Sequence, residues 1–278
     1  MKKTGIMTDS HSGILNEEAE RLGIKVLPMP FYIGEKVYRE GVDLSRDEFY
    51  DMLRKGVDVS TSQPSPVEVL DMWKEMLKEY EEIVYIPLSS ALSGSCMAAQ
   101  AMANEEKFAG KVFVVDNGRV ATPMHRSVLD AVEMVEKGYS GAEIKKILEE
   151  TREKMIIYIG LSTLEYLKKG GRISSMTALA ANVLNIKPVM GADKGVIVKL
   201  DQARGINKGL ARMCAIAVKD AGDIAEKTAV IAHCNNRGRA EQVRDELLKL
   251  APFKEIVITE TAGVATVYAG DGGIVLAI

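Results

Sequence analysis

The chain has 278 residues, of which 47% are hydrophobic, and this suits a globular protein of one large or two ordinary domains. The formal net charge of −3 argues against a nucleic-acid partner, because such proteins usually carry a basic excess. No apolar run approaches the roughly 20 residues that span a bilayer, so we expect no stable membrane insertion.

The amino terminus and the cysteines indicate a cytoplasmic protein. Asp9 interrupts the first residues before the apolar core of an export signal could form. Cys96, Cys214 and Cys234 are odd in number and lack CxxC spacing, so neither a disulfide framework nor a zinc site is predicted. Asp9, Asp43, Asp116 and Asp271 share no metal-ligand spacing. We therefore expect no metal and no cofactor.

Short apolar runs alternate with amphipathic stretches along the chain. Helices are predicted after S-x-x-E boxes, which offer an N-cap hydroxyl and a glutamate three residues later. These boxes begin at Ser45, Ser65 and Ser140. Buried strands are predicted where short β-branched runs are bounded by polar residues. They are the run before Thr8, then 83–86, 112–115, 156–159, 229–232, 256–258 and 274–278.

This alternation predicts an α/β fold with parallel or mixed sheets flanked by helices, and with ligands beyond the carboxyl ends of the strands. The pattern breaks at Lys168-Lys169-Gly170-Gly171-Arg172, and the small-residue stretch 174–184 follows. We therefore predict two domains, 1–160 and 161–278.

Two hydroxyl-rich loops precede predicted helices, 61–66 and 89–95. The first backbone N–H groups of a helix lack partners and its dipole is positive there, so a carboxylate or phosphate is favoured. The structural alternative is that Ser65 and Ser95 are ordinary N-caps. Two such loops on successive strand-to-helix connections favour a shared anion site, because neighbouring loops at one sheet edge converge on the same crevice.

Catalytic motifs are missing from the sequence. The nucleophile elbow G-x-S-x-G is absent, and so is the phosphate loop G-x-x-x-x-G-K-[ST]. Gly270-Asp271-Gly272-Gly273 is interpreted as a turn before the last strand. His11, His125 and His233 have no identified orienting partner, which favours structural roles over catalytic ones.

The chain resembles the DegV family of bacterial fatty-acid-binding proteins over essentially its whole length. The resemblance rests on motifs in the family's order and approximate spacing. They are Thr8-Asp9-Ser10, Thr61-Ser62-Gln63-Pro64-Ser65, Leu88-Ser89-Ser90 with Ser93-Gly94-Ser95, Gly170-Gly171-Arg172-Ile173-Ser174, and Ile186-Lys187-Pro188-Val189.

The resemblance implies two α/β domains with a long-chain fatty acid buried in a tunnel between them, whose wall includes 174–184. It implies that the carboxylate is held by Thr61, Ser62, Ser93 and Ser95. Tyr268 occupies the place of a histidine that approaches the head group in other members. A phenol still donates a hydrogen bond but is not cationic near neutral pH.

The resemblance also implies a partner. In the family, the carrier presents the carboxylate to a separate fatty-acid kinase, and the arginines that match Arg172 and Arg204 act at that interface. Our leading hypothesis is a non-catalytic fatty-acid carrier. One alternative is an enzyme that acts on a small anionic metabolite, with Asp9 or His233 as acid–base. Another is a lipid-sensing regulatory module without kinase coupling.

Overall fold

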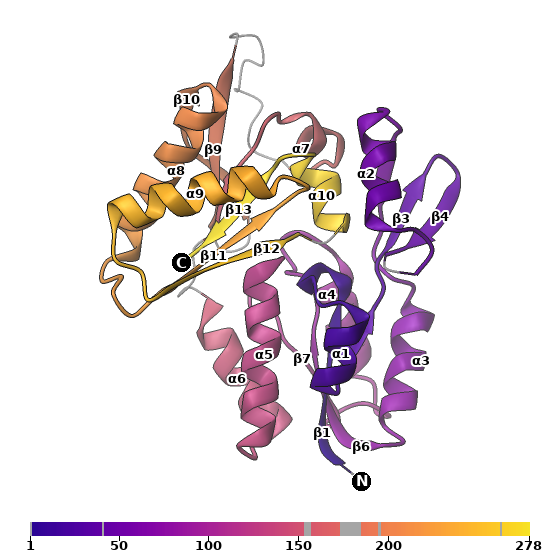
Figure 1. The fold of residues 1–278 in the computed structure, drawn as a ribbon. Helices are drawn as coiled ribbons and strands as arrows, with labels where there is room; N and C mark the ends of the chain where they lie inside the picture. The colour runs from indigo at the N-terminus through magenta and orange to yellow at the C-terminus, as the bar shows by residue number, and fades with distance from the viewer. Residues whose placement is uncertain (1, 41, 153–156, 173–184, 194–195, 262) are drawn as a thin grey trace. The chain divides into compact units, whose positions relative to one another are not determined.

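The computed structural model describes residues 2–40, 42–152, 157–172, 185–193, 196–261 and 263–278 (Figure 1). The chain forms two compact units. The first contains Met1–Arg46 and Val59–Lys154, and the second contains Asp47–Asp58 and Met155–Ile278. Residues 47–58 thus belong to the second unit, although the chain on both sides of them belongs to the first. The division into domains 1–160 and 161–278 stays a prediction.

The first unit is built on a parallel four-stranded sheet with the order β2-β1-β6-β7. Its strands are β1 (Lys2–Asp9), β2 (Lys25–Leu27), β6 (Tyr80–Ile86) and β7 (Val112–Val114). Side chains alternate between the two faces of a strand, and both faces are apolar here. Ile83 and Tyr85 join one core cluster, whereas Val84 and Ile86 join another.

Helices cover both faces of this sheet. The cluster of Ile83 includes Trp73 and Ala99, from α3 and α4, and the cluster of Val84 includes Met124 and Ile144, from α5 and α6. The helices of this unit are η1 (Ser10–Ser12), α1 (Asn16–Leu22), α3 (Pro66–Met76), α4 (Ser95–Ala103), α5 (Thr122–Glu136) and α6 (Gly141–Glu150).

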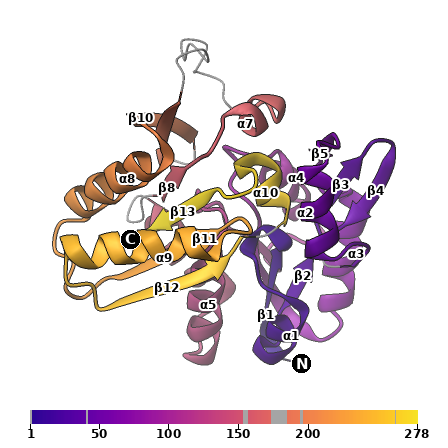
Figure 2. The ribbon, with the colours of Figure 1, turned by 45° about the horizontal axis from the view of Figure 1, so that its top comes forward.

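A small antiparallel sheet with the order β4-β3-β5 completes the first unit (Figure 2). Its strands are β3 (Pro30–Ile33), β4 (Lys36–Arg39) and β5 (Val59–Thr61). β5 runs directly into the first hydroxyl-rich loop. The register pairs Thr61 with Phe31, and so fixes where that loop begins.

The second unit is built on a mixed six-stranded sheet with the order β10-β9-β8-β13-β11-β12. Among the strands of this sheet that the structure describes, only β11 and β12 form a parallel pair. The strands are β8 (Ile157–Gly160), β9 (Ile186–Asp193), β10 (Val196–Arg204), β11 (Thr228–His233), β12 (Glu255–Glu260) and β13 (Ile274–Ala277).

Helices α8 (Ile206–Ala221) and α9 (Arg237–Leu250) pack on this sheet (Figure 1). Leu210 and Met213 of α8 and Val243 of α9 share one core cluster with Ile231 and Leu276 of the strands. The remaining helices of the unit are α2 (Arg46–Arg54), α7 (Glu165–Lys169) and α10 (Gly263–Ala269). Within the described ranges, no helix is both long and apolar enough to cross a membrane.

The predicted fold class is confirmed, because parallel and mixed sheets are flanked by helices as the alternation of elements indicated. Helices follow all three S-x-x-E boxes, and each predicted apolar run lies in or overlaps a strand. The predicted tunnel wall, 174–184, lies outside the residues that the structure describes, as do the last two residues of the Gly170 to Ser174 motif.

Candidate functional site: two hydroxyl-rich loops

The first loop leaves β5 at Thr61 and ends where α3 begins. Thr61 and Ser62 are half-buried, and Gln63 is exposed. The N–H of Ser62 donates to the carbonyl oxygen of Pro30 at 3.4 Å, which extends the ladder of β3 and β5 by one residue. Ser62 Oγ lies 3.1 Å from the Gln63 carbonyl oxygen and 3.5 Å from the hydroxyl of Tyr32. Neighbouring strands therefore hold this loop in place.

The N-terminus of α3 is capped by its own residues. Ser65 Oγ accepts from the N–H of Val67 at 3.3 Å, and the N–H of Ser65 donates to the Glu68 carboxylate at 3.1 Å. This is a complete capping box, which satisfies N-terminal donors and places a negative charge at the positive end of the helix dipole. Ser65 is thus an N-cap, as the structural alternative holds, and Glu68 supplies the anion at this helix end.

The second loop connects β6 to α4 and contains a helical turn of its own. The N–H groups of Leu92 and Ser93 both donate to the Ser89 carbonyl oxygen, at 3.0 and 3.1 Å. Gly94 is the N-cap residue of α4 and has no side chain with which to cap it, while Ser93 Oγ accepts from the N–H of Ser95 at 3.2 Å. The alternative that Ser95 is the N-cap is wrong, because Ser95 is the first residue of the helix.

The two loops contact each other. A Cβ atom added to Gly94 would lie 3.0 Å from Gln63 Oε1, which is closer than ordinary van der Waals contact. The backbone of the second loop therefore lies close against the Gln63 side chain. The hydroxyls of Thr61 and Ser62 precede Gln63, and those of Ser93 and Ser95 flank Gly94. The two loops therefore lie side by side in the first unit, although β5 and β6 belong to different sheets and not to one sheet edge as expected, and the shared anion site stays a prediction.

Ser95 is the member of the site whose hydrogen bonding is incomplete. Its side chain is only 5% exposed, and Oγ has no hydrogen-bond partner among the residues that the structure describes. A buried hydroxyl without a partner costs about 1–3 kcal/mol, so such groups call for an explanation. An anion at the N-terminus of α4 would accept a hydrogen bond from this hydroxyl and interact favourably with the helix dipole.

A charged network fixes the start of the second loop. Ser90 Oγ donates to Asp116 Oδ2 at 2.5 Å, and Arg152 Nη1 lies 3.3 Å from the same oxygen. The N–H of Asp116 donates to Glu149 Oε1 at 3.0 Å, and Lys145 pairs with that carboxylate at 2.7 Å. The loop is thereby tied to the carboxyl end of β7 and to α6, and it is positioned by rigid elements.

Sequence analysis missed Arg119, a cation behind the second loop. Its carbonyl oxygen accepts from the N–H of Ser89, and its side chain is only 5% exposed. The guanidinium donates to the hydroxyl of Ser127 and to the carbonyl and hydroxyl oxygens of Thr151. Burial lowers the pKa of Arg119. The sequence signal was a charged residue directly after Asp116-Asn117-Gly118, where the chain leaves a buried strand.

Asp9 and His233, the residues of the enzymatic alternative, are engaged in backbone contacts. Asp9 is fully buried, and its carboxylate accepts from the N–H groups of His11 at 3.0 Å and Leu88 at 2.8 Å. His233 Nδ1 accepts from the N–H of Asn236 at 3.3 Å. A general base must reach its substrate, and a carboxylate with both oxygens so occupied favours a structural role.

The remaining predicted residues lie in the second unit. Tyr268 is half-buried on α10, and the exposed Arg172 follows α7 with its guanidinium carbon 5.2 Å from the centroid of the Tyr268 ring. Arg204 is exposed at the end of β10, where it pairs with Ile186. The role of both arginines at a partner interface stays a prediction. The prediction that Tyr268 contacts a carboxylate stays a prediction.

A family model described as "Uncharacterised protein, DegV family" matches residues 3–278. The chain belongs to the DegV family. A DegV domain-containing protein of Caldanaerobacter subterraneus, TTE1491, is 32% identical over 234 residues, which cover 84% of this chain and 83% of that protein.

Solved structures of DegV proteins share the fold over the whole chain. A DegV family protein of Ruminococcus gnavus, solved with vaccenic acid, has a TM-score of 0.88 at 27% identity and covers 100% of both chains. A DegV family protein of Thermus thermophilus, described by its fatty acid binding, has a TM-score of 0.88 at 28% identity. The match covers 99% of this chain and 98% of that one.

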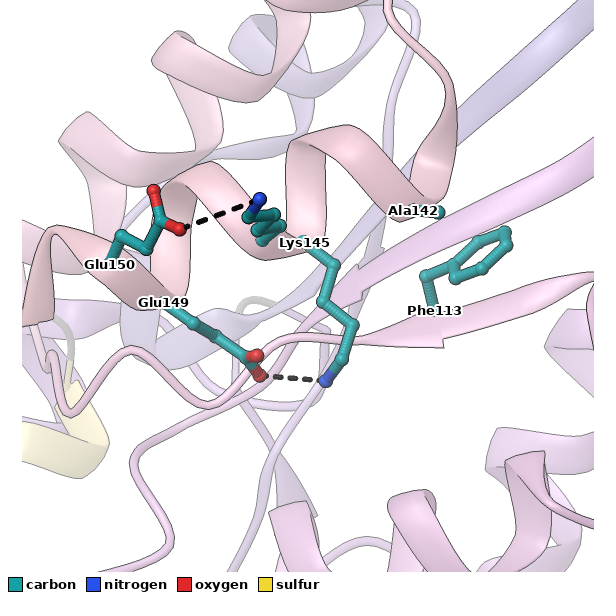
Figure 3. A pocket seen from close by; sticks show the side chains of 6 residues that line it. Phe113, Ala142, Lys145, Glu149 and Glu150 are labelled. Carbon is teal, nitrogen blue, oxygen red and sulfur yellow. Dashed lines mark hydrogen bonds and ion pairs between the residues drawn. The ribbon is translucent and has the colours of Figure 1, made fainter.

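This DegV-family chain also has an open groove of about 550 Å³ on α6, lined in part by Lys145 and Glu149 of the charged network described above (Figure 3). Phe113 and Ala142 form its apolar part. Its two lysines are paired with glutamates on the same helix, Lys145 with Glu149 at 2.7 Å and Lys146 with Glu150 at 3.9 Å. The cations of this groove are neutralised by i,i+4 partners, so it does not resemble an anion site.

Proposed function

We propose that this DegV-family chain binds a long-chain fatty acid and holds its carboxylate at the two hydroxyl-rich loops. The observation that carries the proposal is the Ser95 hydroxyl, which is buried at the N-terminus of α4 beside the Gln63 loop and has no partner among the described residues. Solved DegV structures of 27–28% identity are described with vaccenic acid or with fatty acid binding, which supports the same ligand class.

Thr61, Ser62, Ser93 and Ser95 are the proposed carboxylate ligands. Hydroxyls and helix N–H groups donate to a carboxylate without titrating near neutral pH, so they hold the head group and do no chemistry on it. The acyl chain supplies most of the affinity, because each buried CH₂ contributes about 0.8 kcal/mol. The site therefore orients one end of a ligand whose other end drives binding.

We also propose that the chain acts as a carrier without turnover and presents the carboxylate to a fatty-acid kinase. The exposed arginines, Arg172 and Arg204, are the proposed partner contacts. A guanidinium has several hydrogen-bond donors in one plane, so it binds a carboxylate or phosphate through two parallel hydrogen bonds. The cytoplasmic location stays a prediction from the sequence.

Extraction of the purified protein under denaturing conditions, followed by mass spectrometry, tests the lipid ligand. We expect about one long-chain fatty acid per chain, and a higher melting temperature when palmitate or oleate is added to delipidated protein. Recovery of no fatty acid together with no thermal shift from either acid would refute the proposal.

Two substitutions test the head-group loops. Thr61→Ala and Ser93→Ala should each weaken fatty-acid binding by about 1–3 kcal/mol, since each removes a donor from a buried carboxylate. Ser60→Ala is the matched control, because Ser60 precedes Thr61 on β5 and is exposed. Both loop variants should lose less affinity for the methyl ester than for the acid. Equal losses for ester and acid would place the carboxylate elsewhere.

A further inference from the structure

Two tyrosines interlock α7 with α10 in the second unit, and the two helices lie side by side in both views (Figures 1 and 2). A Cβ atom at Gly170 would overlap the ring of Tyr268, and one at Gly270 would overlap the ring of Tyr166. Each ring therefore packs against the backbone of a glycine next to the other helix. The glycines allow this close approach because they carry no side chain.

The side chain of Arg172 lies against this contact between α7 and α10. Gly171 has φ of +66°, a left-handed conformation that turns the chain directly after α7. Arg172 Nη1 then donates to the carbonyl oxygen of Gly170 at 2.5 Å, and the guanidinium carbon lies 5.2 Å from the Tyr268 centroid. A guanidinium within about 6 Å of an aromatic centroid is attracted to the ring. The Gly170 carbonyl oxygen and the Tyr268 ring thus both contact the guanidinium of this exposed arginine.

From this geometry we infer that Tyr268 is a positioning residue for Arg172. Its ring is a platform that holds the guanidinium in the orientation that meets the anionic group of the partner. The inference rests on the proposed function, in which Arg172 contacts the kinase. An arginine has several rotatable bonds, so a platform that restricts them before association reduces the entropy lost on binding.

The hydroxyl and the ring of Tyr268 have separate proposed roles. The hydroxyl is the part of the side chain predicted to contact a carboxylate, whereas the ring is the part that supports Arg172. Tyr268→Phe removes only the hydroxyl, and Tyr268→Leu removes the ring as well. Tyr166→Leu is the matched control, because it removes the other interlocking ring, which packs on Gly270.

The first measurement is the NMR signal of the Arg172 side chain in the full-length protein, assigned by its loss in Arg172→Lys. The Tyr268 ring current should shift the side-chain protons of Arg172 upfield. We expect Tyr268→Phe and Tyr166→Leu to keep this shift and Tyr268→Leu to lose it. An Arg172 signal that is unchanged in Tyr268→Leu would overturn the inference, whether or not the protein binds lipid.

The second measurement is acyl-phosphate formation by a bacterial fatty-acid kinase with the loaded protein as its substrate. Tyr268→Leu should raise the KM for the carrier by roughly two- to fivefold, as expected for a cation–π contact at an exposed site. Tyr268→Phe and Tyr268→Leu both lack the hydroxyl that is predicted to contact the carboxylate, so the two variants should carry equal amounts of fatty acid. Tyr268→Leu should nevertheless have a higher KM for the carrier than Tyr268→Phe, because only Tyr268→Leu lacks the ring that contacts Arg172. Equal KM values for the Phe and Leu variants would overturn the inference. A wild-type protein without fatty acid would instead refute the proposed function.

Discussion

Ser95→Ala should stabilise the delipidated protein and weaken its binding of fatty acid, so that the two effects largely offset each other in the loaded protein. In delipidated protein the Ser95 hydroxyl is 5% exposed and has no partner among the described residues, and such a group costs about 1–3 kcal/mol. Removing it, together with the better helix propensity of alanine, should raise the free energy of unfolding by roughly that amount. For a chain of 278 residues this is a rise of about 2–5 °C in melting temperature.

In loaded protein the same hydroxyl donates to a carboxylate, a hydrogen bond worth about 1.5–3 kcal/mol. Fatty-acid affinity should therefore fall by about ten- to a hundredfold in Ser95→Ala. The assay is thermal and urea unfolding of delipidated and palmitate-loaded protein, with isothermal calorimetry for the affinity. Ser90→Ala is the control, because Ser90 Oγ donates to Asp116 Oδ2 and its loss should destabilise both forms.

Two results would contradict this prediction. If Ser95→Ala destabilises the delipidated protein as much as Ser90→Ala does, the Ser95 hydroxyl already has a hydrogen-bond partner before lipid binds. If the affinity for palmitate is unchanged in Ser95→Ala, the hydroxyl has no part in holding the carboxylate.

Three further predictions concern the supporting structure. Ser65→Ala removes the cap of α3 and should lower the free energy of unfolding by about 1 kcal/mol in urea unfolding, with a small effect in Ser65→Asp as the contrasting control. Thr261→Val should cost about 1–3 kcal/mol, because the buried Thr261 hydroxyl bonds the Cys234 thiol at 3.1 Å and the Thr266 hydroxyl at 3.2 Å; an unchanged urea midpoint would contradict this. Burial raises the pKa of Cys234 to about 11, above the value of about 8.5 for an exposed thiol, so its contribution is complete below pH 8.5 and declines as the pH rises toward 11. Cys234→Ala should therefore lose stability less steeply between pH 8.5 and 11, and equal slopes would refute the assignment.

Local patterns determined the helix starts and the central strands. The spacing of Ser65 and Glu68 predicted where α3 begins, and the structure shows both hydrogen bonds of that capping box. Ser140 and Glu143 do the same for α6. These contacts join residues three apart, so the sequence alone is enough to predict them. The short strands β2 to β5 were not predicted, because three or four residues of mixed polarity give no clear period.

The position of α2 was decided by tertiary structure. The sequence predicts an amphipathic helix after Ser45, and Phe49, Tyr50 and Leu53 are indeed buried. The hydroxyl of Tyr50 lies 3.4 Å from that of Thr266, which is 216 residues away in the sequence. Periodicity shows which face of a helix is apolar but not which surface will cover it, so the place of 47–58 in the second unit could not be read from the chain.

Some features of the candidate site were likewise determined by the sequence, and others only by the tertiary structure. The sequence by itself determined that two hydroxyl-rich loops lie directly before helices, because helix periods and turn residues are local properties. Only the tertiary structure decided that Gln63 meets Gly94, that Ser65 is satisfied by its capping box while Ser95 is buried without a partner, and that Arg172 rests on Tyr268. Burial and hydrogen-bond satisfaction depend on groups far apart in the chain, and so they exist only after the chain has folded.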